Sequence, residues 1–195
     1  MWFACAPQRL RSASLRITGW KLKLLIFDIK LRAYALAIST RHIDLRKMVL
    51  AWDMPVGKAP AGVIWQNGRV LVANMGSDDV AIVDPRDGRV IERLKIGKGT
   101  HTLFRSPDGK HLWVNSRIDS TVTVLDATSL KVVRTYKLPG GPDDLVFAPD
   151  GKIWFTLRFA HKVAVLDPTS GTFTTIAVGR SPHGIFINPL ARPAK

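Results

Sequence analysis

The chain has 195 residues, of which 46% are hydrophobic, and it carries a formal net charge of +14 at pH 7. This hydrophobic content is ordinary for a globular protein and excludes an intrinsically disordered chain. The single cysteine, Cys5, excludes an internal disulfide framework and any metal or covalent haem site that needs paired cysteines.

Residues 1–36 form an atypical basic segment. Residues 1–50 hold ten of the 29 Lys and Arg residues but two of the 15 Asp and Glu residues. The arginines and serines of residues 9–16 weakly suggest a transit peptide, and residues 2–5 weakly resemble the end of a lipoprotein signal, so no convincing export signal is found. Residues 21–27 (KLKLLIF) are too short and too charged to cross a membrane. We therefore predict a strand there and no transmembrane segment.

The rest of the chain is built from a repeat of about forty residues. Turn glycines recur at Gly68, Gly109 and Gly151, and aspartates recur at the same step at Asp84, Asp126 and Asp167. Full copies cover residues 57–96, 97–137 and 138–177, partial copies cover 37–56 and 178–189 within a repeat region of 37–189, and 190–195 form a loose tail. Such a period, with four short strands per copy, predicts an all-β propeller of four-stranded blades.

Each copy is expected to contain four strands, which we name a to d from the propeller axis outwards. Strand a covers residues 62–65, 102–105, 144–147 and 184–187; strand b covers 70–73, 111–114 and 153–156; strand c covers 80–83, 122–125 and 163–166; strand d covers 90–94, 132–136 and 173–176. Strand b is nearly all apolar, as expected for a strand covered on both faces. The aspartates after strand c can accept N–H groups of the following turn, which gives them a structural role.

The motif SPDGKHLWVNS at residues 106–116, followed by VTVLD at 122–126 and KVVRT at 131–135, resembles the YVTN-family β-propeller repeat. That family occurs in surface-layer, periplasmic and secreted proteins, so the resemblance implies a periplasmic or extracellular location. Members usually close a ring of seven blades, whereas this chain has three complete copies. We interpret it as a fragment of a longer propeller with a misassigned start, a four-bladed ring, or half of an oligomer that self-associates.

Residues 151–185 also resemble the repeats of streptogramin lyases. This resemblance implies that His183, in the Pro-His-Gly pattern, would act as a general base near a carboxylate and a magnesium ion. Leu157 stands where the lyase pattern carries glutamate, which argues against lyase activity. Lactone hydrolysis has only fold analogy behind it, since no Gly-x-Ser-x-Gly motif is present. The alternative function is thus an enzyme of the lyase or lactonase kind that uses His183 and His101. Our main interpretation is a binding module, in which no active site is expected.

The residues that immediately precede each strand a are the candidates for a binding site. They are Ala61, His101, Asp143 and His183, and each follows the proline position of the loop that leads from strand d. Because the innermost strands converge on the axis, we predict two imidazoles and a carboxylate around one mouth of the channel. Without a spacing motif these groups do not define a metal site, and we assign neither a metal nor a cofactor.

Basic residues gather on the loops of the same face. They are Lys98, Arg117, Arg158 and Arg180 in the candidate set, with Lys58 and Lys162 nearby. We predict a positive upper face that binds an anionic small molecule or a protein, against the alternative of a solvated loop rim. Nucleic acid is not expected as a partner, because the chain has no aromatic-interleaved basic strand and no helix-turn-helix pattern.

Overall fold

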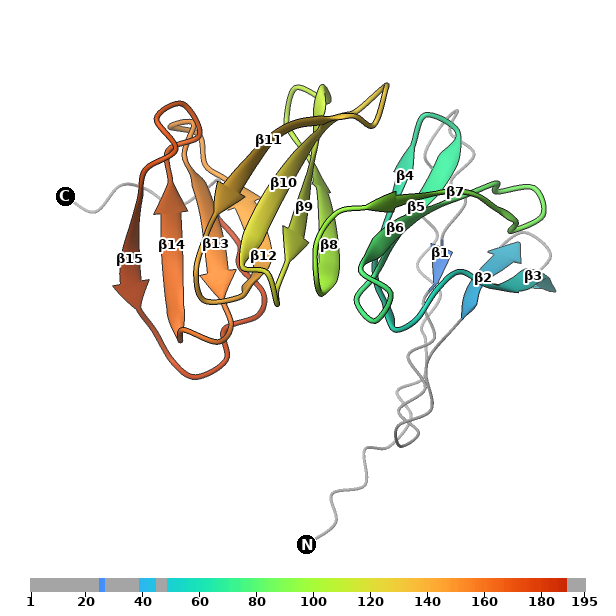
Figure 1. Ribbon diagram of the computed structural model, residues 1–195, viewed down its shortest axis with the longest axis horizontal. Coiled ribbons are helices and arrows are strands. Elements are labelled where there is room, and N and C mark those ends of the chain that lie inside the picture. Colours follow the sequence, from blue (N-terminus) through green and yellow to red (C-terminus); the bar gives the residue numbers. More distant parts are fainter. Residues whose placement is uncertain (1–24, 27–38, 45–48, 189–195) are drawn as a thin grey trace, which may run out of the picture.

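The computed structural model describes residues 25–26, 39–44 and 49–188, and the regular structure of these ranges consists of β-strands (Figure 1). The predicted all-β class is confirmed. Within the described ranges there is no helix of the length and apolarity that crossing a membrane requires.

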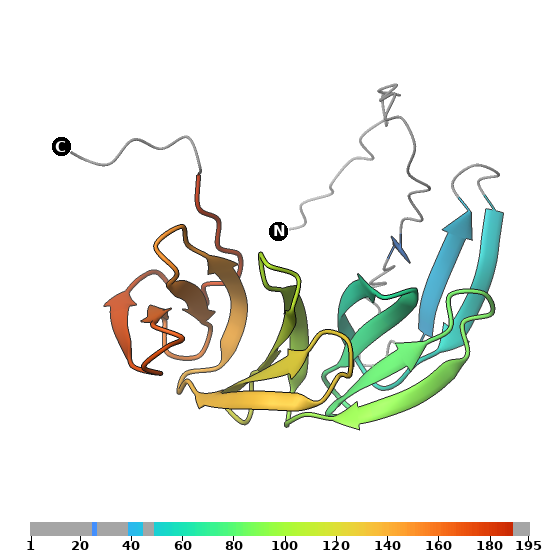
Figure 2. The same cartoon turned by 90° about the horizontal axis from the view of Figure 1, so that it is seen from above.

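Three four-stranded antiparallel sheets form the blades. Blade 1 consists of β4 (Pro60–Gln66), β5 (Arg69–Asn74), β6 (Asp79–Val83) and β7 (Val90–Lys95); blade 2 of β8 (Thr100–Arg105), β9 (His111–Ser116), β10 (Thr121–Asp126) and β11 (Val132–Lys137); blade 3 of β12 (Pro142–Phe147), β13 (Ile153–Leu157), β14 (Lys162–Leu166) and β15 (Phe173–Ala177). Consecutive strands pair in chain order, so strands a to d lie side by side as predicted. Viewed from above, the sheets follow one another around an arc that is open on one side (Figure 2).

An N-terminal sheet precedes blade 1. Its strands are β1 (Leu25–Ile26), β2 (Ser39–Asp44) and β3 (Val49–Pro55), in the order β1-β2-β3. The β2–β3 hairpin supplies the two outer strands of the incomplete blade, as expected, and β1 lies inside the strand predicted at residues 21–27. Trp52 of β3 is buried against blade 1 and its Nε1–H donates to the Pro85 carbonyl at 3.0 Å.

The strand predicted at residues 184–187 is absent from the structure. The prediction was wrong because a strand needs a partner for its backbone groups, and no neighbouring strand of the described chain pairs with this segment. The segment instead lies against the face of blade 3 that is turned away from blade 2. There Ile185, Phe186 and Ile187 line a groove.

Local turn chemistry accounts for the repeated hairpins. The turns between strands a and b need a left-handed residue, and Gly68, Gly109 and Gly151 take φ values of 76°, 71° and 83° there. After strand c, the Asp126 carboxylate accepts the N–H groups of Thr128 at 3.1 Å and Ser129 at 2.7 Å. Asp84 and Asp167 accept equivalent bonds at 2.9 and 2.8 Å, which confirms the structural role of these aspartates.

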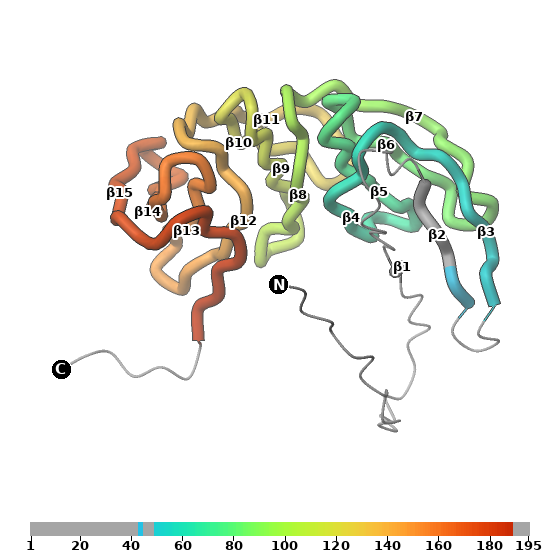
Figure 3. Tube along the Cα trace, turned by 90° about the horizontal axis from the view of Figure 1, so that it is seen from below, coloured from blue at the N-terminus to red at the C-terminus, as the bar shows by residue number. Residues whose placement is uncertain are grey.

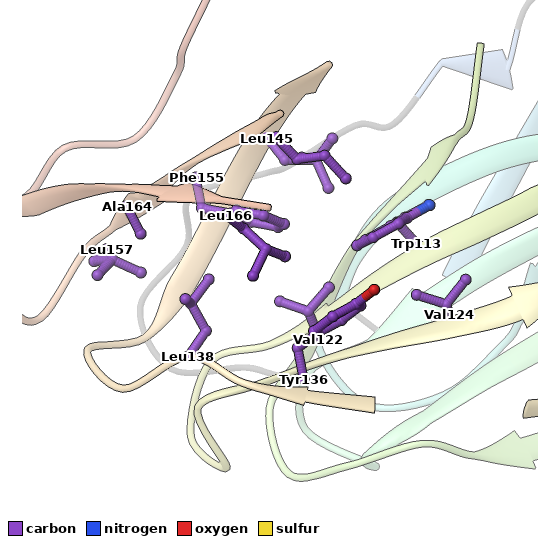
Figure 4. Packing of buried hydrophobic residues seen from close by; sticks show 11 residues of the cluster. Trp113, Val122, Val124, Tyr136, Leu138, Leu145, Phe155, Leu157, Ala164 and Leu166 are labelled. Carbon is purple, nitrogen blue, oxygen red and sulfur yellow. The ribbon is translucent and has the colours of Figure 1, made fainter. Parts of the chain in front are cut away.

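The apolar core lies between blades. Between blades 2 and 3, Trp113 stacks on Tyr136 with ring centroids 5.4 Å apart and packs in one cluster with Phe155 and Leu157 (Figure 4). A similar cluster joins Leu71 and Ile82 of blade 1 to blade 2. Each fully buried Leu or Phe side chain contributes about 1.5–3 kcal/mol, so these interfaces fix the order of the blades around the arc.

Candidate functional site

Four loops that lead from strand d to strand a share one backbone feature. A residue with positive φ occurs at one equivalent position in each, at Ala59 (49°), Gly99 (69°), Gly141 (73°) and Ser181 (52°). Two residues further on come Ala61, His101, Asp143 and His183. The first three are the second residues of β4, β8 and β12, which follow the inner side of the arc (Figure 3). The recurring loop therefore brings these positions to the same level of the propeller axis, as the sequence predicted.

Asp143 is the centre of a cluster at this level. Its side chain is 0% exposed, and Arg117 donates to its Oδ1 through Nε at 2.6 Å and also through Nη2. Its Oδ2 accepts Nη1 of Arg158 at 3.1 Å and lies 2.8 Å from Nδ1 of His183. His101 Nδ1 lies 3.1 Å from Oδ1, but its orientation makes no hydrogen bond. We call these five residues the axial cluster.

The backbone of Asp143 also joins blades. Its carbonyl accepts the hydroxyl of Thr102 at 2.6 Å and Nδ2 of Asn115 at 3.1 Å, and both of these donors belong to blade 2. The hydroxyl of Thr156 donates to the carbonyl of His183 at 2.7 Å. The positions of Asp143 and His183 are thus held by main-chain contacts as well as by their side chains.

The protonation states follow from burial and neighbouring charge. Burial alone raises the pKa of Asp143, but the hydrogen bonds from Arg117, His183 and Arg158 outweigh it, and the pKa lies below its ordinary value. Burial, reinforced by the positive charge of Arg117, lowers the pKa of His101 to about 4. At neutral pH the cluster therefore contains one carboxylate, a neutral His101 and two guanidinium groups, which leaves an excess of positive charge.

Two donors of the cluster are accessible to solvent. The side chains of Arg158 and His183 are 35% and 60% exposed, whereas that of Arg117 is 12% exposed. Within the described ranges, Arg158 bonds to protein atoms through Nη1 alone, and His183 uses its ring Nδ1. Nε and Nη2 of Arg158 and Nε2 of His183 remain available to a ligand. Apolar side chains follow both arginines in the sequence: Phe159, next to Arg158, is 58% exposed, and Ile118, next to Arg117, is 64% exposed.

The other predicted ligand-binding residues lie outside the cluster. Lys98 and Arg180 are exposed on the loops of the same face, and among the described residues neither forms an ion pair with the cluster. In blade 1, Met75 occupies the position of Arg117 and Arg158, and its Sδ lies 3.8 Å from Nη1 of Arg117. The charge of the site therefore comes from blades 2 and 3.

Sequence reasoning overlooked Asp144. Its side chain is half-buried and burial raises its pKa, while its neighbour Asp143 also disfavours its charged form. Its position in the repeat could have identified it, because blade 3 carries a carboxyl group where blades 1 and 2 have Gly62 and Thr102.

Over the described part of the chain, no group of three or more His, Cys, Asp or Glu side chains is arranged to hold a metal ion. Leu157, where a lyase would carry glutamate, is 1% exposed in the core between blades 2 and 3.

Comparisons with known proteins agree with this architecture. The model of the YNCE-like beta-propeller family matches residues 36–192. Protein NirF of Pseudomonas aeruginosa is 26% identical over 144 residues, which are 71% of this chain and 37% of NirF. YncE of Salmonella typhimurium is 29% identical over 84 residues, which are 43% of this chain and 24% of YncE. The chain thus spans well under two thirds of the length of either relative.

Among solved structures, the catalytically inactive virginiamycin B lyase of Staphylococcus aureus with quinupristin superposes with a TM-score of 0.61. The two are 19% identical, and the match covers 75% of this chain and 52% of the lyase. At this identity the likeness concerns the fold. It confirms the predicted YVTN-type propeller and its resemblance to streptogramin lyases.

Proposed function

This chain belongs to the YNCE-like β-propeller family, and from that membership and the geometry of the axial cluster we propose that it is a binding module for an anionic ligand. The observation that carries the proposal is the excess of positive charge around Asp143, with free N–H donors on Nε and Nη2 of Arg158. A planar guanidinium with two unused N–H groups suits a carboxylate or phosphate.

The cluster is also pre-organised for this task. Arg158 and His183 both contact Oδ2 of the buried Asp143, so a ligand meets side chains that are already oriented. Pre-organisation reduces the entropy lost on binding and favours a defined site over a solvated rim of mobile side chains.

Calorimetric titration with citrate and with inorganic phosphate tests the proposal. Arg158→Ala should weaken binding at least about tenfold, because a charge-assisted hydrogen bond contributes about 1.5–3 kcal/mol. Lys98→Ala is the matched control: it removes an exposed positive charge from the same face but leaves the cluster intact, and it should change the dissociation constant less than about twofold. Equal losses in both variants would show a diffuse charged rim and refute a defined site.

One observation favours a second candidate, a propeller enzyme of the lyase kind. The contact of 2.8 Å between His183 Nδ1 and Asp143 orients the imidazole and leaves Nε2 free, as in a general base held by a carboxylate. Incubation with quinupristin, followed by mass spectrometry with and without EDTA, tests this function. Turnover that is lost in His183→Ala would establish the enzyme, and an unchanged substrate would eliminate this lyase activity.

The resemblance to YVTN repeats also leads us to place the protein in the periplasm or outside the cell. Fractionation of cells that express the chain from its own gene with a C-terminal tag is the measurement. Recovery in the cytoplasmic fraction alone would refute the location without affecting the binding proposal.

A further inference from the structure

The loop between strands b and c is fixed by the same two backbone hydrogen bonds in each blade. In blade 3 the N–H groups of Arg158 and Phe159 donate to the carbonyls of Gly141 and Gly140, both at 2.9 Å. The acceptors belong to the loop that leads from strand d to strand a. The equivalent donors are Arg117 and Ile118 in blade 2, and Met75 and Gly76 in blade 1. The backbone therefore fixes where these pairs of side chains lie.

The two blades that supply an arginine to the axial cluster also supply an exposed apolar side chain from the next position. Those side chains are Phe159 and Ile118, whereas blade 1 has Met75 in place of the arginine and Gly76 in place of the apolar residue. Blade 2 packs against a blade on either side, so the exposure of Ile118 belongs to the loop position itself. Positive charge and exposed apolar surface thus occur together in this repeat.

Each of these apolar side chains packs on a glycine. A Cβ at Gly141 would lie 2.7 Å from Cε2 of Phe159, which is closer than real Cβ atoms approach. A Cβ at Gly99 would likewise lie 2.8 Å from Cγ1 of Ile118. Both glycines stand two positions before the cluster residue of their own strand a. The apolar side chains are therefore held against the loops that lead into the axial cluster, while more than half of each remains exposed.

We propose that the ligand of the axial cluster is an oxyanion that carries an apolar body, such as an aryl carboxylate or an aryl phosphate. This inference deepens the proposed function and rests on it. The oxyanion accepts hydrogen bonds from Nε and Nη2 of Arg158, which the described residues leave unused. The apolar body covers Phe159 and Ile118, each of which follows an arginine of the cluster.

This ligand class matches both components of the surface. Small-molecule sites combine apolar contacts with a few polar groups that fix the orientation of the ligand. An inorganic anion uses only the guanidinium and leaves the two apolar side chains in water. A neutral apolar molecule leaves the positive charge around Asp143 without a counter-ion. A ligand that carries both groups satisfies the charge and covers the apolar surface at once.

Calorimetric titration with two pairs of ligands tests the proposal. Inorganic phosphate and 1-naphthyl phosphate differ in the apolar body, and acetate and 1-naphthylacetate form the matching carboxylate pair. In the pair that binds, the naphthyl ligand should bind at least about tenfold more tightly, because covering about 60 Å² of apolar surface corresponds to that factor. The pair with the higher affinity identifies the oxyanion.

Substitutions separate the two parts of the site. Phe159→Ala should reduce the tenfold preference to less than about threefold, and Ile118→Ala should reduce it in the same direction. Phe173→Ala is the matched control and should preserve the preference, because it removes a 38% exposed ring from the outermost strand of the same blade. Arg158→Ala should weaken both ligands of a pair by the same factor. The heat-capacity change on binding should be more negative for the naphthyl ligand, and Phe159→Ala should reduce this difference.

The result that overturns the inference differs from the one that overturns the proposed function. Equal dissociation constants within each pair, or a preference that neither Phe159→Ala nor Ile118→Ala reduces, would overturn the apolar contact and leave anion binding intact. A preference lost in Ile176→Asp but kept in Phe159→Ala would place the ring in the groove on blade 3 and also overturn it. Absence of binding by all four ligands would refute the proposed function itself.

Discussion

Replacement of Asp143 by asparagine should be among the most damaging single changes in the axial cluster. The substitution keeps the shape of the side chain and removes its charge. Asp143 is 0% exposed and Arg117 is 12% exposed, so the change leaves a nearly buried guanidinium without its counter-charge. Breaking a buried pair from one side costs about 3–5 kcal/mol, a large part of the roughly 5–15 kcal/mol that holds a domain folded.

The three side chains that bond to the Asp143 carboxylate should contribute unequally to this loss. Arg158 and His183, at 35% and 60% exposure, can turn towards water when Asp143 loses its charge. Double-mutant cycles should therefore give a coupling of about 2 kcal/mol or more between Asp143 and Arg117, but less than about 1 kcal/mol between Asp143 and Arg158.

Urea unfolding monitored by tryptophan fluorescence is the assay. Asp167→Asn serves as the control, because asparagine can still accept the Thr169 N–H at this turn, and it should cost less than about 1 kcal/mol. The denaturant slopes should stay equal, so that midpoints report stability. An Asp143→Asn protein within about 1 kcal/mol of wild type would refute the view of Asp143 as the electrostatic centre.

Two further predictions concern the core and the response to pH. Phe155→Ala, at a fully buried ring, should lower the free energy of unfolding by about 3–5 kcal/mol, whereas Phe159→Ala, at 58% exposure in the same blade, should change it by less than about 1 kcal/mol; equal urea midpoints would contradict this. The pKa of His101 is about 4 in the folded chain and about 6.5 when unfolded, so the unfolded state binds more protons between these values and stability should fall by up to about 3 kcal/mol as pH drops from 6.5 to 4. His101→Gln should flatten this dependence in urea titrations at pH 7 and 4.5, and an unchanged slope would disprove the assignment; the lowered pKa of Asp143 contributes only below its ordinary value of 3.8.

The blades could be predicted because their turns are decided locally. Gly109 adopts positive φ in a two-strand hairpin and Asp126 caps the next turn through its own neighbours, so recurrence of these residues at a fixed step marks recurring structure. The failure at residues 184–187 has the opposite cause. Their local sequence matches strand a, but strand formation depends on a partner strand that the described chain does not supply.

The site was predictable in position but not in its contacts. The recurring loop placed His101, Asp143 and His183 at one level, which follows from register. That Arg117 of blade 2 reaches Asp143 of blade 3 depends on the rotation between blades, which no local pattern encodes. For the same reason Lys98 and Arg180, equally basic in sequence, could not be separated from the two arginines of the cluster.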